Sequence, residues 1–238
     1  MSLTSTLLDP ILRAAPARPL VTFYDDATGE RIELSAVTTA NWVAKAANLL
    51  RDECDVEPGG RVAVLLPAHW QTASVLLAVW SCGAEVVAEP AEADWVFTDR
   101  DRLDLALGAA PAGGTLALSL DAFGRGIDGL PDGVLDFATE VRLHGDEFVP
   151  WEPVPGTATA LDGATVADLV ARATARAGAL GLGPDSRVLS TRSWTAVPDL
   201  VDGLLAVLAA GASLVQVANP DDTRLDRKYE SERCTVRL

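Results

Sequence analysis

One apolar phrase occurs twice in the sequence, and this near-repeat constrains the fold more than any other feature. LLAVWSCGAEVV runs from Leu76 to Val87, and LLAVLAAGASLV runs from Leu204 to Val215. In each copy an apolar run of helical length ends at a glycine and is followed by a short β-branched run. A helix that stops at glycine before a buried strand is typical of an α/β protein.

The match extends upstream of both phrases. Apolar residues between Thr39 and Arg51 have the spacing of one helix face, VEPGG predicts a turn, and RVAVLLP predicts a buried strand. An apolar helix over 71–82 and the strand EVVAEP follow. In the second copy TVADLVARATARAGAL, LGPDSRVLS and LVDGLLAVLAAGASLVQV occur in the same order. We therefore predict an α/β fold with two pseudo-repeated lobes of mainly parallel sheet flanked by helices.

The spacing of the two copies is nearly constant. Pro58 pairs with Pro184 and Arg61 with Arg187 at an offset of 126, which grows to 128 by the second helix. A two-residue insertion before that helix explains the change. The alternative is that any two units built from Ala, Leu, Val and Gly look alike, and the sequence leaves it open.

We predict one domain over residues 1–238, with pseudo-repeat units at about 39–90 and 165–218 and a variable middle segment at 91–164. In that segment ADWVFTD and GTLALSL predict strands, and VLDFATEVRLHGDEFVPW predicts a hairpin or edge region. The last residues, RLDRKYESERCTVRL, predict a charged surface helix followed by a short strand.

Charge and composition exclude several classes of partner. The net charge of -15 and the pI near 4.4 argue against nucleic acid and acidic membrane surfaces, which attract Lys and Arg. The N-terminal residues resemble neither a signal peptide nor a membrane span, so we expect a cytoplasmic protein. Cys54, Cys82 and Cys234 are far apart without CxxC spacing, and we expect buried small hydrophobic residues.

From Leu34 to Pro90, with PGGRVAVLLP and LLAVWSCGAEVV, the chain resembles the N-terminal domain of adenylate-forming enzymes. This superfamily includes acyl-CoA synthetases and other AMP-binding enzymes. The segment from LGLGPDSRVLSTRSW through LLAVLAAGASLV resembles a later part of the same domain. ESERCTV resembles the helix and strand that follow this part. The resemblance implies a short, truncated and degenerate member of the superfamily.

The resemblance implies a phosphate-binding loop just before the helix near Thr165. In the family this loop is rich in Ser, Thr and Gly and ends in a lysine. Backbone N–H groups, hydroxyls and the lysine ammonium bind the ATP phosphates. The stretch here is PVPGTATALDGATV, with Gly156, Thr157, Thr159 and Gly163 at the degenerate positions, no lysine, and an added Asp162. Such a loop should repel a triphosphate.

Two further departures concern the rest of the machinery. Thr195 and Ala196 stand where the family has an aromatic-His pair beside its substrate pocket. The adenine and ribose motifs and the C-terminal domain with its catalytic lysine have no counterpart before Leu238. We therefore expect no catalytic residue, no metal and no cofactor, with ATP or AMP as the alternative ligand.

The hypothesis for function is a non-catalytic relative that acts as a binding or partner protein, with a second copy or another protein covering a truncated sheet edge. The alternative is residual nucleotide or acyl-adenylate binding or ligase activity, as one half of a split acyl-CoA synthetase-like enzyme.

Other motifs favour structural roles. Gly124, Gly126 and Gly129 have GxGxxG spacing, but Pro131 and Gly133 predict a turn instead of the required helix. His69 lies at a strand-to-helix turn and is expected to cap the helix. Arg172 and Arg176 lie four apart on one predicted helix, where they either bind an anion or solvate the helix face.

Overall fold

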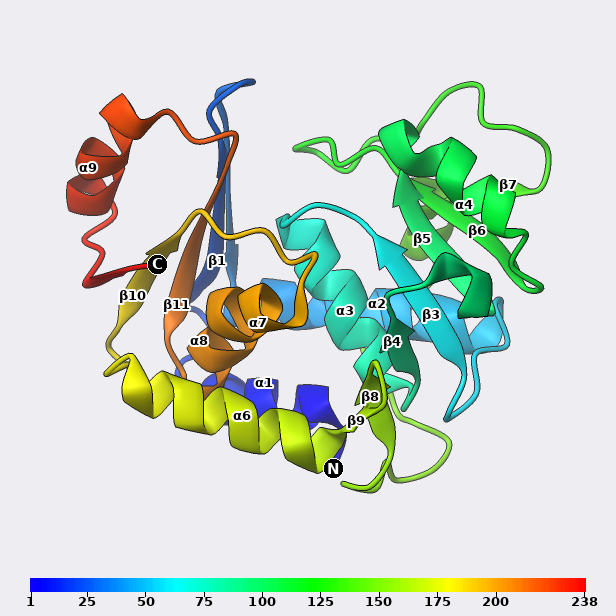
Figure 1. Cartoon of the computed structure of the whole chain (residues 1–238), viewed down its shortest axis with the longest axis horizontal. Coiled ribbons are helices and arrows are strands. Elements are labelled where there is room, and N and C mark those ends of the chain that lie inside the picture. The colour runs from blue at the N-terminus through cyan, green and yellow to red at the C-terminus, as the bar shows by residue number, and fades with distance from the viewer. The chain divides into compact units, whose positions relative to one another are not determined.

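Two β-sheets organise the chain, and the computed structural model describes all of residues 1–238 (Figure 1). The residues divide into two compact units. The first comprises Met1–Thr4, Ala40–Leu66 and Ser74–Ala167, and the second comprises Ser5–Thr39, Pro67–Ala73 and Asp168–Leu238. Both sheets are mainly parallel and flanked by helices, which confirms the predicted fold class.

The sheet of the first unit has seven strands in the order β7-β6-β5-β3-β4-β8-β9. Every neighbouring pair is parallel except the hairpin β8-β9. The strands are β3 (Arg61–Leu65), β4 (Glu85–Val87), β5 (Trp95–Asp99), β6 (Gly114–Leu118), β7 (Val134–Asp136), β8 (Thr159–Leu161) and β9 (Ala164–Thr165).

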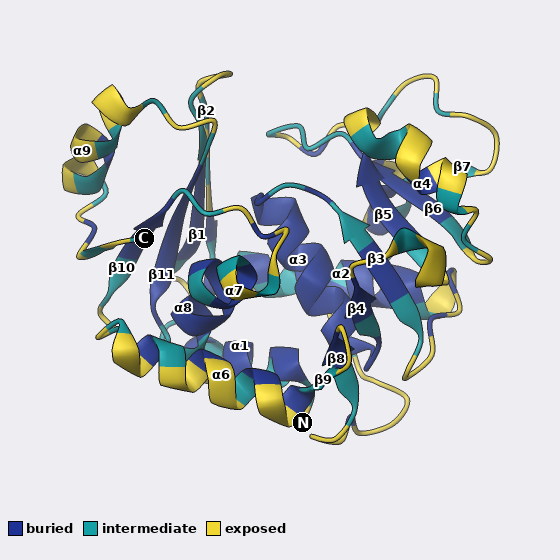
Figure 2. Cartoon of the chain, viewed as in Figure 1, coloured by how far each residue is buried: buried dark blue, intermediate teal, exposed yellow.

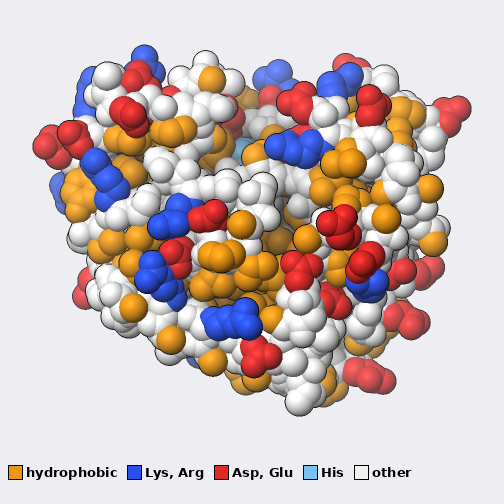
Figure 3. Space-filling model, viewed as in Figure 1, with side chains coloured by type: hydrophobic (Ala, Val, Ile, Leu, Met, Phe, Trp, Pro, Cys, Tyr) orange, Lys and Arg blue, Asp and Glu red, His pale blue; other side chains and the backbone are white.

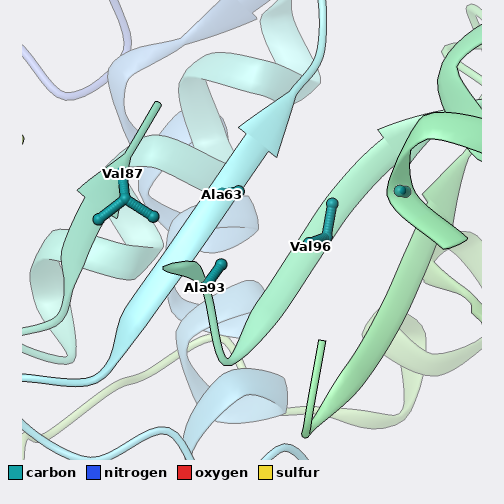
Figure 4. Packing of buried hydrophobic residues seen from close by; sticks show 5 residues of the cluster. Ala63, Val87, Ala93 and Val96 are labelled. Carbon is teal, nitrogen blue, oxygen red and sulfur yellow. The ribbon is translucent and has the colours of Figure 1, made fainter. Parts of the chain in front are cut away.

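Helices precede or connect these strands. They are α2 (Ala36–Asp52), α3 (Trp70–Ser81), α4 (Leu103–Ala109) and α5 (Phe137–Glu140), with short 3-10 turns η1 (Pro90–Glu92), η2 (Arg100–Arg102) and η3 (Val141–Leu143). Part of the core is built from small side chains, because Ala63, Val87, Ala93 and Val96 pack together across β3, β4 and β5 (Figure 4). Small side chains let a helical turn approach the strands closely.

The sheet of the second unit has five strands in the order β12-β10-β11-β1-β2. Its strands are β1 (Pro19–Asp25), β2 (Glu30–Ser35), β10 (Arg187–Ser190), β11 (Ser213–Ala218) and β12 (Val236–Arg237). Its helices are α1 (Leu3–Ala14), α6 (Val166–Ala179), α7 (Val197–Leu200), the π-helix η4 (Val201–Leu205), α8 (Ala206–Ala209) and α9 (Asp222–Ser231). The central strands are buried, whereas α6 and α9 have exposed outer faces (Figure 2).

Helix α9 covers one face of this sheet. Leu225 and Tyr229 from the helix pack against Leu189 and Val215 of the strands. Ion pairs join the helix region to its surroundings, including Lys228 with Asp26, Arg224 with Asp221, and Arg237 with Asp226. The surface around α9 accordingly carries basic and acidic side chains next to one another (Figure 3).

The same turn chemistry occurs after α3 and after α8. Gly83 and Gly211 both have positive φ, at 77° and 67°, where a residue without Cβ is favoured. The N–H of Ala84 donates to Val79 O and that of Ala212 to Val207 O, which is the helix-ending pattern expected beyond such a glycine. The loop 191–196 is two residues longer than the loop 66–69, where the sequence places its insertion.

Three predicted features need correction or addition. Of the two alternatives for 134–151, the edge region is confirmed and the hairpin is wrong, because β7 is a parallel edge strand followed by α5 and η3. The helix over 197–209 is interrupted by the π-helix η4. The hairpin of β1 and β2 was not predicted; β1 lies inside the sheet, where it also pairs in parallel with β11.

None of the helices combines the length with the apolar character that crossing a membrane requires.

Candidate functional site

The position of the implied phosphate loop is a closed β-hairpin. Thr159 lies in β8 and Gly163 at the turn, while Gly156 and Thr157 lie in an exposed turn before the strand. Asp162 and Gly163 have φ of 44° and 78°, the two positive values of a type I′ turn. The four sequence-predicted residues are therefore distributed over a turn, a strand and a hairpin tip.

The tip of the hairpin is hydrogen-bonded to β4 and the residue that follows it. Asp162 donates its N–H to Val86 O at 3.0 Å, and its Oδ1 accepts the N–H of Ala88 at 2.8 Å. Gly163 donates its N–H to Glu85 Oε1 at 2.5 Å. The added carboxylate at Asp162 therefore has a structural role, and the N–H groups of the turn have acceptors within the protein.

The start of α6 is satisfied in the same way. Val166 donates its N–H to Ala158 O at 2.9 Å, and Ala167 donates its N–H to Gly156 O at 2.9 Å. These first-turn N–H groups are the ones that a helix offers to a phosphate. Here the carbonyls of the preceding turn take them.

The electrostatics of the hairpin are unfavourable for an anion. From residue 143 to 171 the chain has no Lys or Arg, but it has Asp146, Glu147, Glu152, Asp162 and Asp168. Glu85 and Asp162 both contact the turn itself. The residues at this position do not fit a triphosphate.

The loop 191–196 contains the position at which the family has its aromatic-His pair. Thr195 and Ala196 are exposed, whereas Trp194 is buried at 7% exposure. The indole lies against Gly203 in η4, where an added Cβ would be 2.9 Å from Trp194 Nε1. A side chain at this point of the π-helix would require Trp194 to shift.

Three buried polar atoms around this loop lack a hydrogen-bond partner, namely Arg192 Nε, Trp194 Nε1 and Gln216 Oε1. Gln216 Nε2 donates to Arg192 O at 3.0 Å, which joins β11 to the loop. Arg192 also pairs with Asp199 at 2.8 Å. Unpartnered buried polar atoms are uncommon and require an explanation. The sequence offered no signal for Gln216, which lies inside an apolar strand.

His69 caps α3, as predicted. Its ring is buried, and Nδ1 accepts the N–H of Gln71 at 3.2 Å, with the edge of Phe23 against it. Burial lowers the pKa of His69, and the nearby Glu30 opposes this shift only in part. Glu30 Oε1 lies 3.8 Å from His69 Nε2. The imidazole is therefore held neutral in a helix-capping role.

The remaining candidates are structural. Gly124, Gly126 and Gly129 lie in a loop without a following helix, and Gly126 approaches Asp136 closely. Arg176 forms a two-point ion pair with Asp202 at 2.6 and 2.9 Å, so its guanidinium already has a carboxylate partner.

The thiols are buried. Burial raises the pKa of Cys54 and Cys82 to about 12 and that of Cys234 to about 11, so they are neutral at physiological pH. No three or more His, Cys, Asp or Glu side chains are arranged to hold a metal ion.

Solved structures define the class of fold. The chain matches a Brucella canis acyl-CoA synthetase with a TM-score of 0.79 at 17% identity, covering 100% of this chain and 47% of that one. It matches the anthranilate CoA ligase AuaEII, solved with anthranoyl-AMP, with a TM-score of 0.76 at 14% identity, covering 100% of this chain and 49% of that one. The chain thus has the fold of the N-terminal domain of adenylate-forming enzymes and spans about half the length of these structures.

A curated relative defines the family. No family model matches the chain. The chain is 54% identical over 238 residues to a TIGR03089 family protein from Mycobacterium tuberculosis (strain ATCC 25618 / H37Rv), covering 98% of this chain and 97% of that protein. The chain belongs to the TIGR03089 family.

Proposed function

We propose that the protein is a non-catalytic relative of adenylate-forming enzymes that acts as a binding protein. The observation that carries the proposal is the hairpin at Asp162 and Gly163. Its N–H groups, and those of Val166 and Ala167 at the start of α6, already have acceptors within the protein. An ATP phosphate would have to displace these bonds without an ammonium or guanidinium to replace them.

The energetic cost supports the same proposal. Removing one donor that stabilises developing charge in an active site commonly costs about a hundredfold or more in rate. At this loop the turn N–H groups already donate to acceptors within the protein, and the lysine is absent. Asp162 adds a carboxylate. Because these changes act on the same anion, their effects accumulate.

The test is ATP–pyrophosphate exchange with a panel of short-chain, medium-chain, aromatic and amino carboxylic acids. We expect exchange at the level of the enzyme-free background for every acid. An active acyl-CoA synthetase in the same assay is the positive control. Acid-dependent exchange by the purified chain would show that it adenylates carboxylates and would overturn the proposal.

The alternative function, residual binding of a nucleotide or acyl-adenylate, has one observation in its favour. Arg192 Nε, Trp194 Nε1 and Gln216 Oε1 are buried and lack hydrogen-bond partners, as groups that await a polar ligand would. Calorimetric titration with AMP and with a non-hydrolysable acyl-adenylate analogue tests this alternative. Saturable binding of either ligand that is weakened by Gln216→Leu would favour this alternative, provided that the exchange assay shows no activity. It would then be favoured over a function in which the protein binds an unrelated ligand.

The partner proposal is a homodimer or a complex that covers the edge strand β12. This strand pairs only with β10, and its other edge has no neighbouring strand. Open strand edges pair readily with further strands. Light scattering coupled to size-exclusion chromatography should give a mass above 24.9 kDa. A monomer at all concentrations would exclude the homodimer. A partner protein would be detected as a mass shift when that protein is added. The second half of a split enzyme would be detected as ligase activity when that half is added.

A further inference from the structure

An apolar groove of about 280 Å³ lies in the second unit, bordered by α1, α6 and the end of α8. Helix α1 contributes Leu7, Pro10 and Ile11, while α6 contributes Val170 and α8 contributes Leu208. These side chains give the groove a mostly hydrocarbon surface. Burial of a ligand's alkyl group here would remove apolar surface from water and so favour binding.

Small residues keep the groove open. Ala14, Ala209, Ala210 and Gly211 line it, and their side chains end at Cβ or are absent. Larger residues at these positions would fill the space between the helices. The groove volume is close to the lower end of the range for small-molecule sites.

Arg18 supplies the polar element of the groove. Its guanidinium donates to Pro184 O at 2.5 Å and to Gly211 O at 2.6 Å, which fixes the side chain at the groove wall. No carboxylate lies within ion-pair distance of Arg18, in a protein whose net charge is -15. A guanidinium has five N–H donors, so two bonds to carbonyls leave donors for an anion.

The groove is distinct from the candidate functional site. Arg18 precedes β1, Pro184 precedes β10 and Gly211 precedes β11, so the groove lies at the amino ends of three parallel strands. The loop 191–196 follows the carboxyl end of β10. The groove shares no residue with that loop or with the hairpin of β8 and β9.

We propose that this groove binds a small amphiphilic carboxylate, with its alkyl chain against α1, α6 and α8 and its carboxylate on Arg18. The apolar walls would contact the ligand's alkyl chain, and the guanidinium, which has no carboxylate partner in the protein, would bind the ligand's carboxylate. A charge-assisted hydrogen bond between guanidinium and carboxylate is about twice as strong as a neutral one, which gives the anion an advantage over an alcohol of the same length.

The experiment titrates octanoate and 1-octanol, below their aggregation limits, into ¹⁵N-labelled protein and follows amide shifts by NMR. We expect saturable shifts at residues around the groove, with octanoate binding at least tenfold more tightly than 1-octanol. Ala14→Trp places a large side chain in the groove at an exposed position and should weaken both ligands at least tenfold. Ala17→Trp, at an exposed position outside the groove, is the matched control and should leave both affinities unchanged.

The charge is tested separately. Arg18→Gln should weaken octanoate about tenfold and leave 1-octanol within about twofold, whereas Arg13→Gln, the same charge change in the last turn of α1, should alter neither. If Arg18→Gln lowers the Tm strongly, Arg18→Lys replaces it as the variant, and octanoate should retain its preference over 1-octanol. Absence of saturable shifts, equal loss of both ligands in Arg18→Gln, or binding unaffected by Ala14→Trp would each overturn the proposal.

Discussion

Asp162 stabilises the hairpin of β8 and β9 through both its side chain and its backbone conformation. Its carboxylate accepts the N–H of Ala88, and its φ of 44° is a value that Asp and Asn tolerate better than Ala. Replacement by Ala should therefore lower the free energy of unfolding by about 1–2 kcal/mol. Replacement by Asn keeps an acceptor and the backbone preference, and should cost about 0.5 kcal/mol or less.

Urea unfolding of the two variants checks this prediction. Equal losses in Asp162→Ala and Asp162→Asn would mean that the charge itself, and not the hydrogen bond and turn geometry, stabilises the hairpin.

Asp26 and Lys228 form the most buried ion pair in the second unit, with side chains 6% and 10% exposed and 2.5 Å between Oδ1 and Nζ. Burial alone would raise the pKa of Asp26, but the N–H of Asp221 and the ammonium of Lys228 lower it overall. A carboxyl with a folded pKa below its unfolded value of about 3.9 stabilises the fold above that pH, and this stability is lost as the pH falls through the folded pKa.

Lys228→Met leaves the Asp26 carboxylate buried without its partner and should cost about 3 kcal/mol at pH 7. The cost should shrink towards pH 3, because Asp26 in the variant then becomes protonated. Adding Asp26→Asn to Lys228→Met should recover much of the loss at pH 7. Chemical denaturation at both pH values measures this, and a cost that is the same at pH 7 and pH 3 would contradict the role given to the ion pair.

At the scale of elements, the backbone of the π-helix η4 lies close to the indole of Trp194 at Gly203. An added Cβ at Gly203 would lie 2.9 Å from Trp194 Nε1, so Gly203→Ala should lower the free energy of unfolding by about 1–3 kcal/mol. Gly178 lies in α6 with no atom within 4 Å of an added Cβ. Gly178→Ala should instead stabilise the protein by about 0.5–1 kcal/mol, since Ala favours helix.

Thermal and urea unfolding of the pair checks both signs. If Gly203→Ala left the free energy of unfolding unchanged, Trp194 would be able to move aside without cost. This result would contradict tight packing of the loop 191–196 against η4.

The elements that could be predicted from the sequence are those with strong local signals. Helices α2, α3, α6 and α9 and strands β3, β5, β6, β10 and β11 have clear periodicity or β-branched runs with glycine or proline at their ends. The π-helix has no such signal, and the close approach of Trp194 to Gly203 is a tertiary contact that local sequence does not reveal.

Two hairpins were missed although their turns carry local signals. The pair Asp162–Gly163 has the Asp-Gly sequence of a type I′ turn, and the turn ahead of Gly29 connects β1 to β2. The first hairpin lies at the position where the resemblance implies a phosphate loop. The partners of its N–H groups, Glu85 and Val86, lie too far away in the sequence to be predicted.

At the scale of the whole molecule, the order of helices and strands was sufficient to predict a mainly parallel α/β fold, and the resemblance of particular segments implied the adenylate-forming type. The candidate site was predictable as a position but not as a structure. The sequence indicated that a lysine is absent and that Asp162 is added. Only the structure revealed that the N–H groups of the hairpin and of α6 have internal acceptors.

The most direct test of the central claim, that this chain does not bind a triphosphate, is thermal unfolding of the whole chain with ATP and Mg²⁺ up to millimolar concentrations. A ligand of the native state adds about 2.7 kcal/mol of stability at a hundredfold excess over its Kd. We predict an unchanged Tm at every ATP concentration. A Tm that rises with ATP in a saturable manner would contradict the account.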